Sequence, residues 1–269
     1  YRGDTLFGYV SFSLFAFMLA ERVDIVEFTY EAYRKLVMIL GESGYVFCGY
    51  SNVYDYDRTV IMRHDVDFDL EKACTLAALE EQMGVQSTYF VLVATDFYNV
   101  LSKNSRDKIR TIISLGHDIG LHFDETQYAI NSIGGFQERV MVEAKILSDA
   151  LDYEINVVSM HRPSKAILKR NIKFQRLVNS YSPEFFVHMK YLSDSRMFWR
   201  EDVIDIVMSR KYDRLHILTH PFWYSVTEES LEHKLIKFLN LASIERYNHL
   251  DTNFRGLNEV IKPEVLISG

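Results

Sequence analysis

Four polar clusters in this chain each follow a short apolar run, and each contains a side chain able to bind a metal ion or to transfer a proton. They are Arg63-His64-Asp65-Val66-Asp67, Gly120-Leu121-His122-Phe123-Asp124-Glu125, Ser159-Met160-His161-Arg162-Pro163 and Leu218-Thr219-His220-Pro221. A single buried histidine or aspartate is more often a hydrogen-bonded structural group than a ligand. Four clusters that all end strand-like runs favour an active site over core packing.

The first two clusters contain the residue types of a metal site. Asp65 and Asp67 are two residues apart, so one carboxylate is able to bind a metal while the other accepts a proton. The alternative for Asp67, capping of the following helix, is met better by Asp69. His122 has carboxylates beside it, and such a combination suits Zn²⁺ and similar ions. These residues predict a site for a divalent metal.

The other two clusters contain a cation and a proton donor. Arg162 precedes Pro163, which biases it toward an extended backbone, and a guanidinium at a strand end is able to orient a carboxylate through two parallel hydrogen bonds. His220 suits general acid work, because imidazole titrates near neutral pH. The aromatic residues 222–224 then form either an apolar or sugar-stacking wall or ordinary core.

The elements that must position these clusters alternate between strands and helices. Strands are expected at 59–64, 87–94, 119–122, 155–160 and 215–219, and helices are expected after the caps Thr29, Asp69 and Ser105, over 136–151 and from 227 onward. This alternation indicates βαβ units and a parallel sheet. At this chain length we expect an irregular (β/α) barrel of about seven parallel strands, whose active site lies at the carboxyl ends of the strands.

One domain is the simplest organisation of the 269 residues. No repeat or Pro/Gly-rich linker divides the chain, so a single catalytic domain is expected over 1–269, with 1–58 as an N-terminal helical extension packed on the barrel. The apolar stretch 7–20 is shorter than the roughly 20 residues of a membrane span. No membrane span is therefore expected, and this stretch is interpreted as a packed helix or an oligomer contact.

Composition restricts the partners and the compartment. The formal net charge of −7 argues against a nucleic-acid partner. The two cysteines, Cys48 and Cys74, form no C-x-x-C pattern, so no disulfide framework is implied and a cytoplasmic location fits.

The motifs between residues 60 and 224 resemble those of the polysaccharide deacetylases, the NodB-like carbohydrate esterases of family four, in a divergent branch found among bacterial surface-polysaccharide enzymes. The family's opening D-x-D is similar to Asp65-Val66-Asp67, its G-H-E-I-G and H-S/T-x-x-H to residues 116–126, its R-x-P to Arg162-Pro163 and its L-x-H-P to residues 218–221. By this resemblance Asp65 is the catalytic base, Arg162 supports it, and Asp67 and His122 bind the metal.

The chain departs from the family pattern at one metal ligand. The second histidine of H-S/T-x-x-H falls on Thr126, and a hydroxyl replaces imidazole poorly on Zn²⁺. His161 is the candidate for the missing ligand, and Asp124, Glu125 or water are the alternatives. Side chains alternate along a strand, so His161 and Arg162 both point inward only if the turn before Pro163 breaks the strand.

The resemblance also implies a reaction. His220 is the general acid, and Asp194 resembles the aspartate that tunes it. The expected protein is a Zn²⁺-dependent hydrolase that removes an acyl group, N-acetyl in particular, from a sugar in surface-polysaccharide biosynthesis such as that of lipopolysaccharide. The acetylated sugar is expected to be nucleotide- or lipid-linked, and a homo-oligomer is compatible with this reading. The alternatives are hydrolysis of a non-sugar C–N bond, such as a cyclic amide, and a catalytically weak sugar-binding protein.

Overall fold

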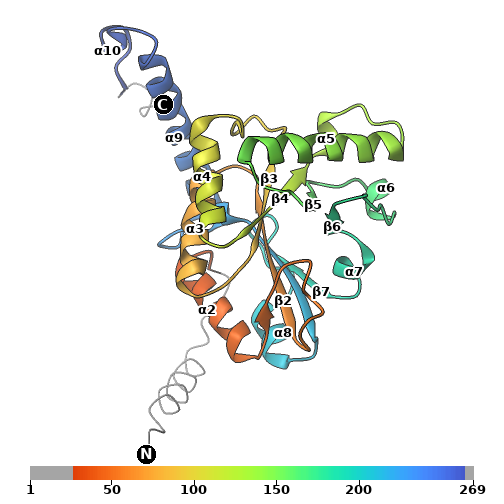
Figure 1. Cartoon of the computed structure of the whole chain (residues 1–269). Helices are drawn as coiled ribbons and strands as arrows, with labels where there is room; N and C mark the ends of the chain where they lie inside the picture. Colours follow the sequence, from red (N-terminus) through yellow and green to blue (C-terminus); the bar gives the residue numbers. More distant parts are fainter. Residues whose placement is uncertain (1–26, 264–269) are drawn as a thin grey trace, which may run out of the picture.

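A computed structural model describes residues 27–263, in which parallel strands alternate with helices (Figure 1). The strands pair in the order β6-β5-β4-β3-β2-β8-β7, with β1 beside β2. Their bounds are β1 Val46–Phe47, β2 Thr59–Val66, β3 Thr88–Leu92, β4 Asp118–Phe123, β5 Val157–Met160, β6 Val178–Asn179, β7 Lys190–Ser193 and β8 Arg214–Thr219. The sheet curls into a half-barrel with β6 and β7 at its edges, which confirms the predicted irregular (β/α) barrel.

Helices connect these strands. The longer ones are α2 Tyr30–Glu42, α3 Leu70–Gln82, α4 Lys103–Ser114, α5 Ile133–Leu151 and α9 Leu231–Asp251, and α9 extends away from the sheet in Figure 1. The shorter ones are η1 Glu125–Gln127, α6 Lys165–Leu168, α7 Pro183–Phe186, α8 Val203–Ser209, η2 Pro221–Trp223 and α10 Leu257–Val260. None of the helices within residues 27–263 has both the length and the hydropathy needed to cross a membrane.

Helix starts follow the capping chemistry of the sequence. Thr29 accepts a hydrogen bond from the backbone of Ala32, and Asp69 caps α3, as predicted. The prediction that Ser105 caps the next helix is wrong. Ser102 is the cap, and its hydroxyl accepts a hydrogen bond from the Ser105 backbone N–H, so α4 begins one turn earlier.

Side chains along β2 alternate between the helices and the interior of the half-barrel. Met62 lies in the core cluster beneath α2, whereas Ile61 packs with Phe90 in a separate interior cluster. Arg63 and Asp65 follow Ile61 on the same face of β2. The interior therefore changes from apolar to charged toward the carboxyl ends of the strands.

Gly120 on β4 makes room for the apolar part of this interior. A Cβ atom at this position would lie 2.5 Å from Cε1 of Phe90 and 3.0 Å from Cγ1 of Val157. Only glycine therefore lets the Phe90 ring cross in front of β4, two residues before His122.

The expected N-terminal extension is partly described. In α2, Leu36 and Leu40 pack in the same core cluster as Leu215 and Ile217 of β8, and β1 adds to the sheet. Residues 1–26, which contain the apolar stretch 7–20, lie outside the described residues. The domain boundaries and the role of that stretch therefore stay predictions.

On the helix side of β2, a buried carboxylate joins α2, α3 and β3. Glu80 of α3 accepts hydrogen bonds from Tyr33, Ser87 and Tyr89 and contacts His64 Nε2 at 2.9 Å. Burial raises the pKa of Glu80, but His64, His117 and the Ser87 hydroxyl outweigh it and lower the pKa to about 2. The ordinary pKa of a glutamate is 4.5, so the folded protein favours the ionised form of Glu80 more than the unfolded chain does. The ionised carboxylate therefore stabilises the fold.

We expect this carboxylate to contribute to the acid sensitivity of the fold. Its folded pKa is depressed, so its contribution is complete above about pH 5 and is lost as pH falls toward 2. A lowering of the Glu80 pKa by two to three units corresponds to about 3 kcal/mol in the free energy of unfolding. Unfolding by urea at pH 5 and pH 3 should show a smaller pH dependence for Glu80→Gln than for wild type. Glu81→Gln, at the exposed neighbouring position, is the matched control and should keep the wild-type dependence.

Candidate metal centre

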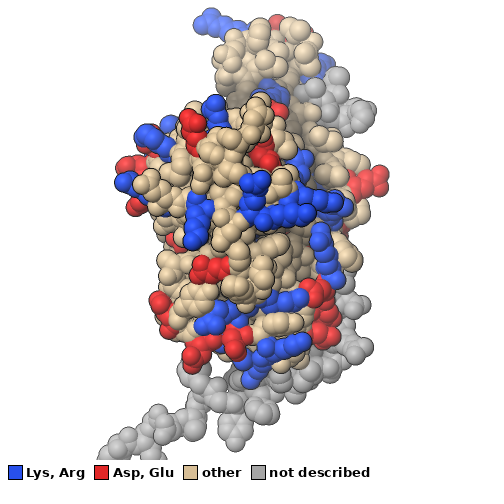
Figure 2. Space-filling model, turned by 90° about the vertical axis from the view of Figure 1, so that its right-hand side faces the viewer, with Lys and Arg blue, Asp and Glu red and all other residues tan. Residues whose placement is uncertain are grey.

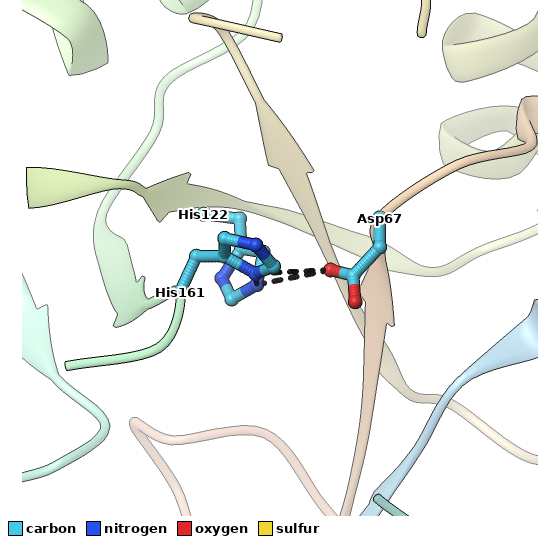
Figure 3. Close-up of side chains that lie close together, drawn as sticks. All are labelled: Asp67, His122 and His161. Carbon is cyan, nitrogen blue, oxygen red and sulfur yellow. Dashed lines mark hydrogen bonds and ion pairs between the residues drawn. The ribbon is translucent and has the colours of Figure 1, made fainter. Parts of the chain in front are cut away.

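Three side chains from three strand ends converge at the rim of the half-barrel (Figure 3). Asp67 follows β2, His122 lies in β4 and His161 follows β5. Asp67 Oδ1 is 3.3 Å from His122 Nε2 and 3.3 Å from His161 Nδ1, and the two ring nitrogens are 3.1 Å apart. One oxygen and two nitrogens thus face a common point.

The spacing of these donor atoms fits a divalent metal. Ligands about 2.0–2.2 Å from a tetrahedral Zn²⁺ stand roughly 3.3–3.6 Å from one another. The three observed separations are close to this range. Asp67 Oδ1 is also buried without a well-formed hydrogen bond to any described residue, which is costly unless a cation binds there. The donor set of two imidazoles and one carboxylate is among those used by catalytic zinc sites.

The turn after β5 brings His161 into this group. The His161 N–H donates to the Phe123 carbonyl (2.8 Å), which extends the pairing of β5 with β4 by one residue. Arg162 then adopts φ 46°, in the left-handed region, instead of the extended backbone predicted from Pro163. The chain therefore leaves the sheet at once, and the Arg162 side chain turns outward with 70% of its surface exposed.

The alternative ligands are engaged elsewhere. The Thr126 hydroxyl and backbone N–H both donate to Asp124 Oδ1, at 2.7 and 3.0 Å. The second Asp124 oxygen lies 3.3 Å from Arg162 Nη2. Glu125 accepts hydrogen bonds from the backbone and hydroxyl of Ser164. Asp124 caps η1, and Glu125 holds the loop at Ser164. The structure does not place Asp124, Glu125 or Thr126 among the donor atoms of the centre.

Asp65 lies beside the centre and is held by Arg63. Arg63 Nε donates to Oδ1 and Nη2 donates to Oδ2, both at 2.8 Å. Oδ2 is also 3.5 Å from His122 Nε2. Burial raises the pKa of Asp65, but Arg63 and the neighbouring histidines outweigh it and bring the pKa below its ordinary value. The carboxylate is therefore ionised at neutral pH.

The structure does not place Arg162 next to Asp65. That position belongs to Arg63, whose side chain is fully buried in the half-barrel. Arg63 also donates to Ser159 and Ser180 and stacks over the rings of Phe90 and Tyr181. The signal for Arg63 was present in the sequence, because residues two apart on a strand share a face.

His220 approaches the centre from the far side. Its Nδ1 is 2.6 Å from Asp194 Oδ1, and its backbone N–H donates to Asp194 Oδ2. Nε2 faces the centre, 3.9 Å from Asp67 Oδ2. Burial lowers the pKa of His220, but the buried Asp194 carboxylate outweighs it and raises the pKa to about 9. The structure thus brings Asp194 and His220 together as a pair.

The aromatic residues after His220 belong mainly to the core. Phe222, Trp223 and Tyr224 are all buried in the cluster that includes α2 and β8. The Trp223 ring centroid is 5.8 Å from that of His220, so it borders the rim. Phe97 is the more exposed aromatic side chain of this region and contacts Phe68, the residue after Asp67.

The metal-ligand assignment leads to a direct test. We expect His161→Ala to weaken Zn²⁺ binding by about ten-fold or more, because a catalytic site normally uses three protein ligands. Thr126→Ala should change the affinity little, since its hydroxyl is bonded to Asp124. Competition with a chromophoric chelator measures both constants. Equal affinity in wild type and His161→Ala would remove His161 from the ligand set.

Comparisons with known proteins give similarity in structure but not in sequence. No family model and no curated protein matches the chain. A CE4 family pseudoenzyme from Bacillus anthracis is 16% identical, with a TM-score of 0.44 over 68% of this chain and 60% of that chain. A family 4 carbohydrate esterase from the same organism is 14% identical, with a TM-score of 0.39 over 75% of this chain and 82% of that chain. IcaB from Ammonifex degensii is 13% identical, with a TM-score of 0.38 over 49% of this chain and 65% of that chain. These identities and TM-scores are too low to assign a reaction to this chain, so its chemistry is inferred from the geometry described above.

Proposed function

We propose that this protein is a metal-dependent hydrolase that removes an acyl group, N-acetyl in particular, from a sugar. The observation that carries the proposal is the convergence of Asp67, His122 and His161 at one rim, with Asp65 and His220 beside them. A possible proton acceptor and a possible proton donor thus flank one candidate metal centre. The motif resemblance supports a sugar of surface-polysaccharide biosynthesis as the substrate, and the two free cysteines are compatible with a cytoplasmic location.

Asp67, His122 and His161 would hold the metal, for which Zn²⁺ suits the two nitrogen donors and one oxygen donor. When bound, such an ion supplies a Lewis acid that polarises an acyl carbonyl and promotes deprotonation of water.

Asp65 would accept the proton of the attacking water. Its lowered pKa keeps it ionised, and the two hydrogen bonds from Arg63 fix the plane of the carboxylate. Oδ2 faces the centre while also bonded to Arg63, so this oxygen is the one placed for proton transfer.

His220 would protonate the leaving amine or alcohol. Asp194 accepts a hydrogen bond from the Nδ1–H group, and the protonated Nε2 is directed at the centre. The raised pKa keeps the imidazole protonated at neutral pH, as a general acid requires.

The proposal is tested by acetate release. Purified protein treated with a chelator and then supplied with Zn²⁺ is incubated with N-acetylglucosamine oligomers, and free acetate is measured. We expect release with Zn²⁺ and little without it. No release from acetylated sugars, together with turnover of cyclic amides, would favour the non-sugar hydrolase. Sugar binding without any turnover would favour a binding protein.

The acid role predicts a pH limit and a dependence on the leaving group. Because the protonated His220 is the active form, turnover should fall as pH rises through about 9. His220→Ala should lower turnover by about 10²–10⁴-fold for an N-acetyl sugar. An aryl acetate, whose leaving group needs no proton, should be affected much less. Equal losses with both substrates would contradict the acid role.

A further inference from the structure

The part of the chain that contains β5, β6 and the connection between them carries a concentration of positive charge. Residues 155–182 contain six basic side chains and no Asp or Glu, although acidic residues outnumber basic ones by 37 to 30 in the whole chain. The six are Arg162, Lys165, Lys169, Arg170, Lys173 and Arg176. We call residues 162–176 the basic segment.

All six side chains are exposed. Figure 2 shows Lys and Arg side chains in a band across the middle of the face on which α6 lies. Arg162 pairs with Asp124, but Lys165, Lys169 and Arg170 make no ion pair with any residue in the described range 27–263. Their positive charge is therefore available to a ligand.

The backbone of the basic segment is held at several points. Ser164 bonds to Glu125 at one end of α6. The Lys173 carbonyl accepts a hydrogen bond from Gln137 of α5, and the Ile172 carbonyl accepts one from Asn179 of β6. The lysines thus extend from a fixed main chain, which lowers the entropy lost when they bind an anion.

The first half of the basic segment begins at the candidate metal centre. Arg162 follows His161 directly, and Lys165 is four residues from this ligand, so their Cα atoms are at most about 14 Å apart. A substrate held at the centre is therefore able to reach α6 with a second group.

The second half of the basic segment suits an anion less well. Lys173 lines a hollow of about 460 Å³ together with His188, but Glu184 lines the same hollow. A carboxylate there would repel an anionic group. Among the basic side chains without an ion pair in residues 27–263, Lys165, Lys169 and Arg170 come first after His161 along the chain.

We propose that Lys165, Lys169 and Arg170 bind a phosphoryl group of the substrate, so that the sugar handled by this centre carries a phosphate or diphosphate. This inference rests on the proposed function. Ammonium and guanidinium groups are the usual protein partners of phosphate oxygens. The phosphate comes from a nucleotide diphosphate or from a lipid diphosphate, which present the same oxygens to these side chains.

Binding measurements separate this inference from the proposed function. Calorimetry on the full chain compares UDP-N-acetylglucosamine with neutral di-N-acetylchitobiose, in the presence of a chelator so that phosphate–metal contacts do not contribute. The test variant is Lys165→Glu with Lys169→Glu. Its control is Lys211→Glu with Arg255→Glu, which makes the same change in net charge at exposed positions outside the basic segment.

We expect UDP-N-acetylglucosamine to bind more tightly than the neutral sugar, and high salt to reduce the difference. The test variant should weaken binding of the nucleotide sugar by about three- to thirty-fold, and the control by less than about two-fold. A polyprenyl diphosphate in phosphatidylcholine vesicles is the second probe. Preference for one probe identifies the source of the phosphate.

Each outcome decides one of the two claims. If UDP-N-acetylglucosamine binds no better than di-N-acetylchitobiose and the polyprenyl diphosphate vesicles bind no better than plain phosphatidylcholine vesicles, the phosphoryl site is ruled out. It is also ruled out if the test and control variants behave alike. Zn²⁺-dependent release of acetate from the neutral sugar would still support the hydrolase in that case. Phosphoryl binding through Lys165 and Lys169 without any acetate release would instead reject the hydrolase and retain the anion site.

Discussion

Replacing Asp65 by Asn is expected to abolish turnover and to leave the metal bound. Asn has nearly the same shape and keeps an oxygen that can accept a hydrogen bond from Arg63, but it accepts no proton at neutral pH. Loss of a positioned base costs about 10²–10⁴-fold in rate. Acetate release and metal content are measured on the same preparation.

The contrasting variants are Asp67→Ala and His122→Ala, which should lose metal and activity together. Asp65 Oδ2 lies 3.5 Å from His122 Nε2, only slightly farther than Asp67 Oδ1 at 3.3 Å. If Asp65→Asn lost its metal and Asp67→Ala kept it, the roles of the two carboxylates would be exchanged. Undiminished metal in both Asp67→Ala and His122→Ala would reject the centre.

The architecture could be predicted because it depends on patterns that extend along the chain. Strand-like runs alternate with amphipathic helices, and this requires a parallel sheet covered by helices. The polar residues after β2, β4, β5 and β8 then had to lie near one rim, since parallel strands present their carboxyl ends together. The proximity of Asp67, His122 and His161 follows from this rule.

The partner of each side chain was harder to predict, because it depends on single backbone torsions. Arg162 was expected to be extended, yet its φ of 46° turns the guanidinium outward and leaves His161 facing inward. A motif match cannot show this, since the letters R and P fit either conformation. Thr126 illustrates the same limit, because its bond to Asp124 depends on the η1 turn.

Arg63 was missed for a different reason. In the sequence, a charged residue that follows apolar residues of a strand is interpreted as the start of the polar cluster. The structure shows that the Arg63 side chain is fully buried in the half-barrel. Strand alternation places it on the face of Asp65. The guanidinium then compensates a carboxylate that would otherwise be buried at high cost.

Replacing Arg63 by Met is expected to be the most damaging of the changes discussed for stability, and it should also lower turnover. Met fills part of the volume but leaves the Asp65 carboxylate buried without its cation, which costs about 3–5 kcal/mol in the free energy of unfolding. The pKa of Asp65 should rise, so the acid limb of the pH–rate profile moves to higher pH. Arg162→Met is the control, and its exposed side chain predicts a much smaller loss.

A double variant shows whether the loss comes from the unpaired charge. Arg63→Met with Asp65→Leu removes both charges, so it should be more stable than Arg63→Met alone, although it is inactive. Arg63→Lys keeps the charge but cannot form two parallel hydrogen bonds, and it should retain more stability than Arg63→Met with reduced turnover. Urea unfolding and acetate release measure these effects. If Arg162→Met lost more turnover than Arg63→Met, the role of supporting Asp65 would return to Arg162. If the double variant were no more stable than Arg63→Met, the packing of the Arg63 side chain would outweigh its charge in stabilising the fold.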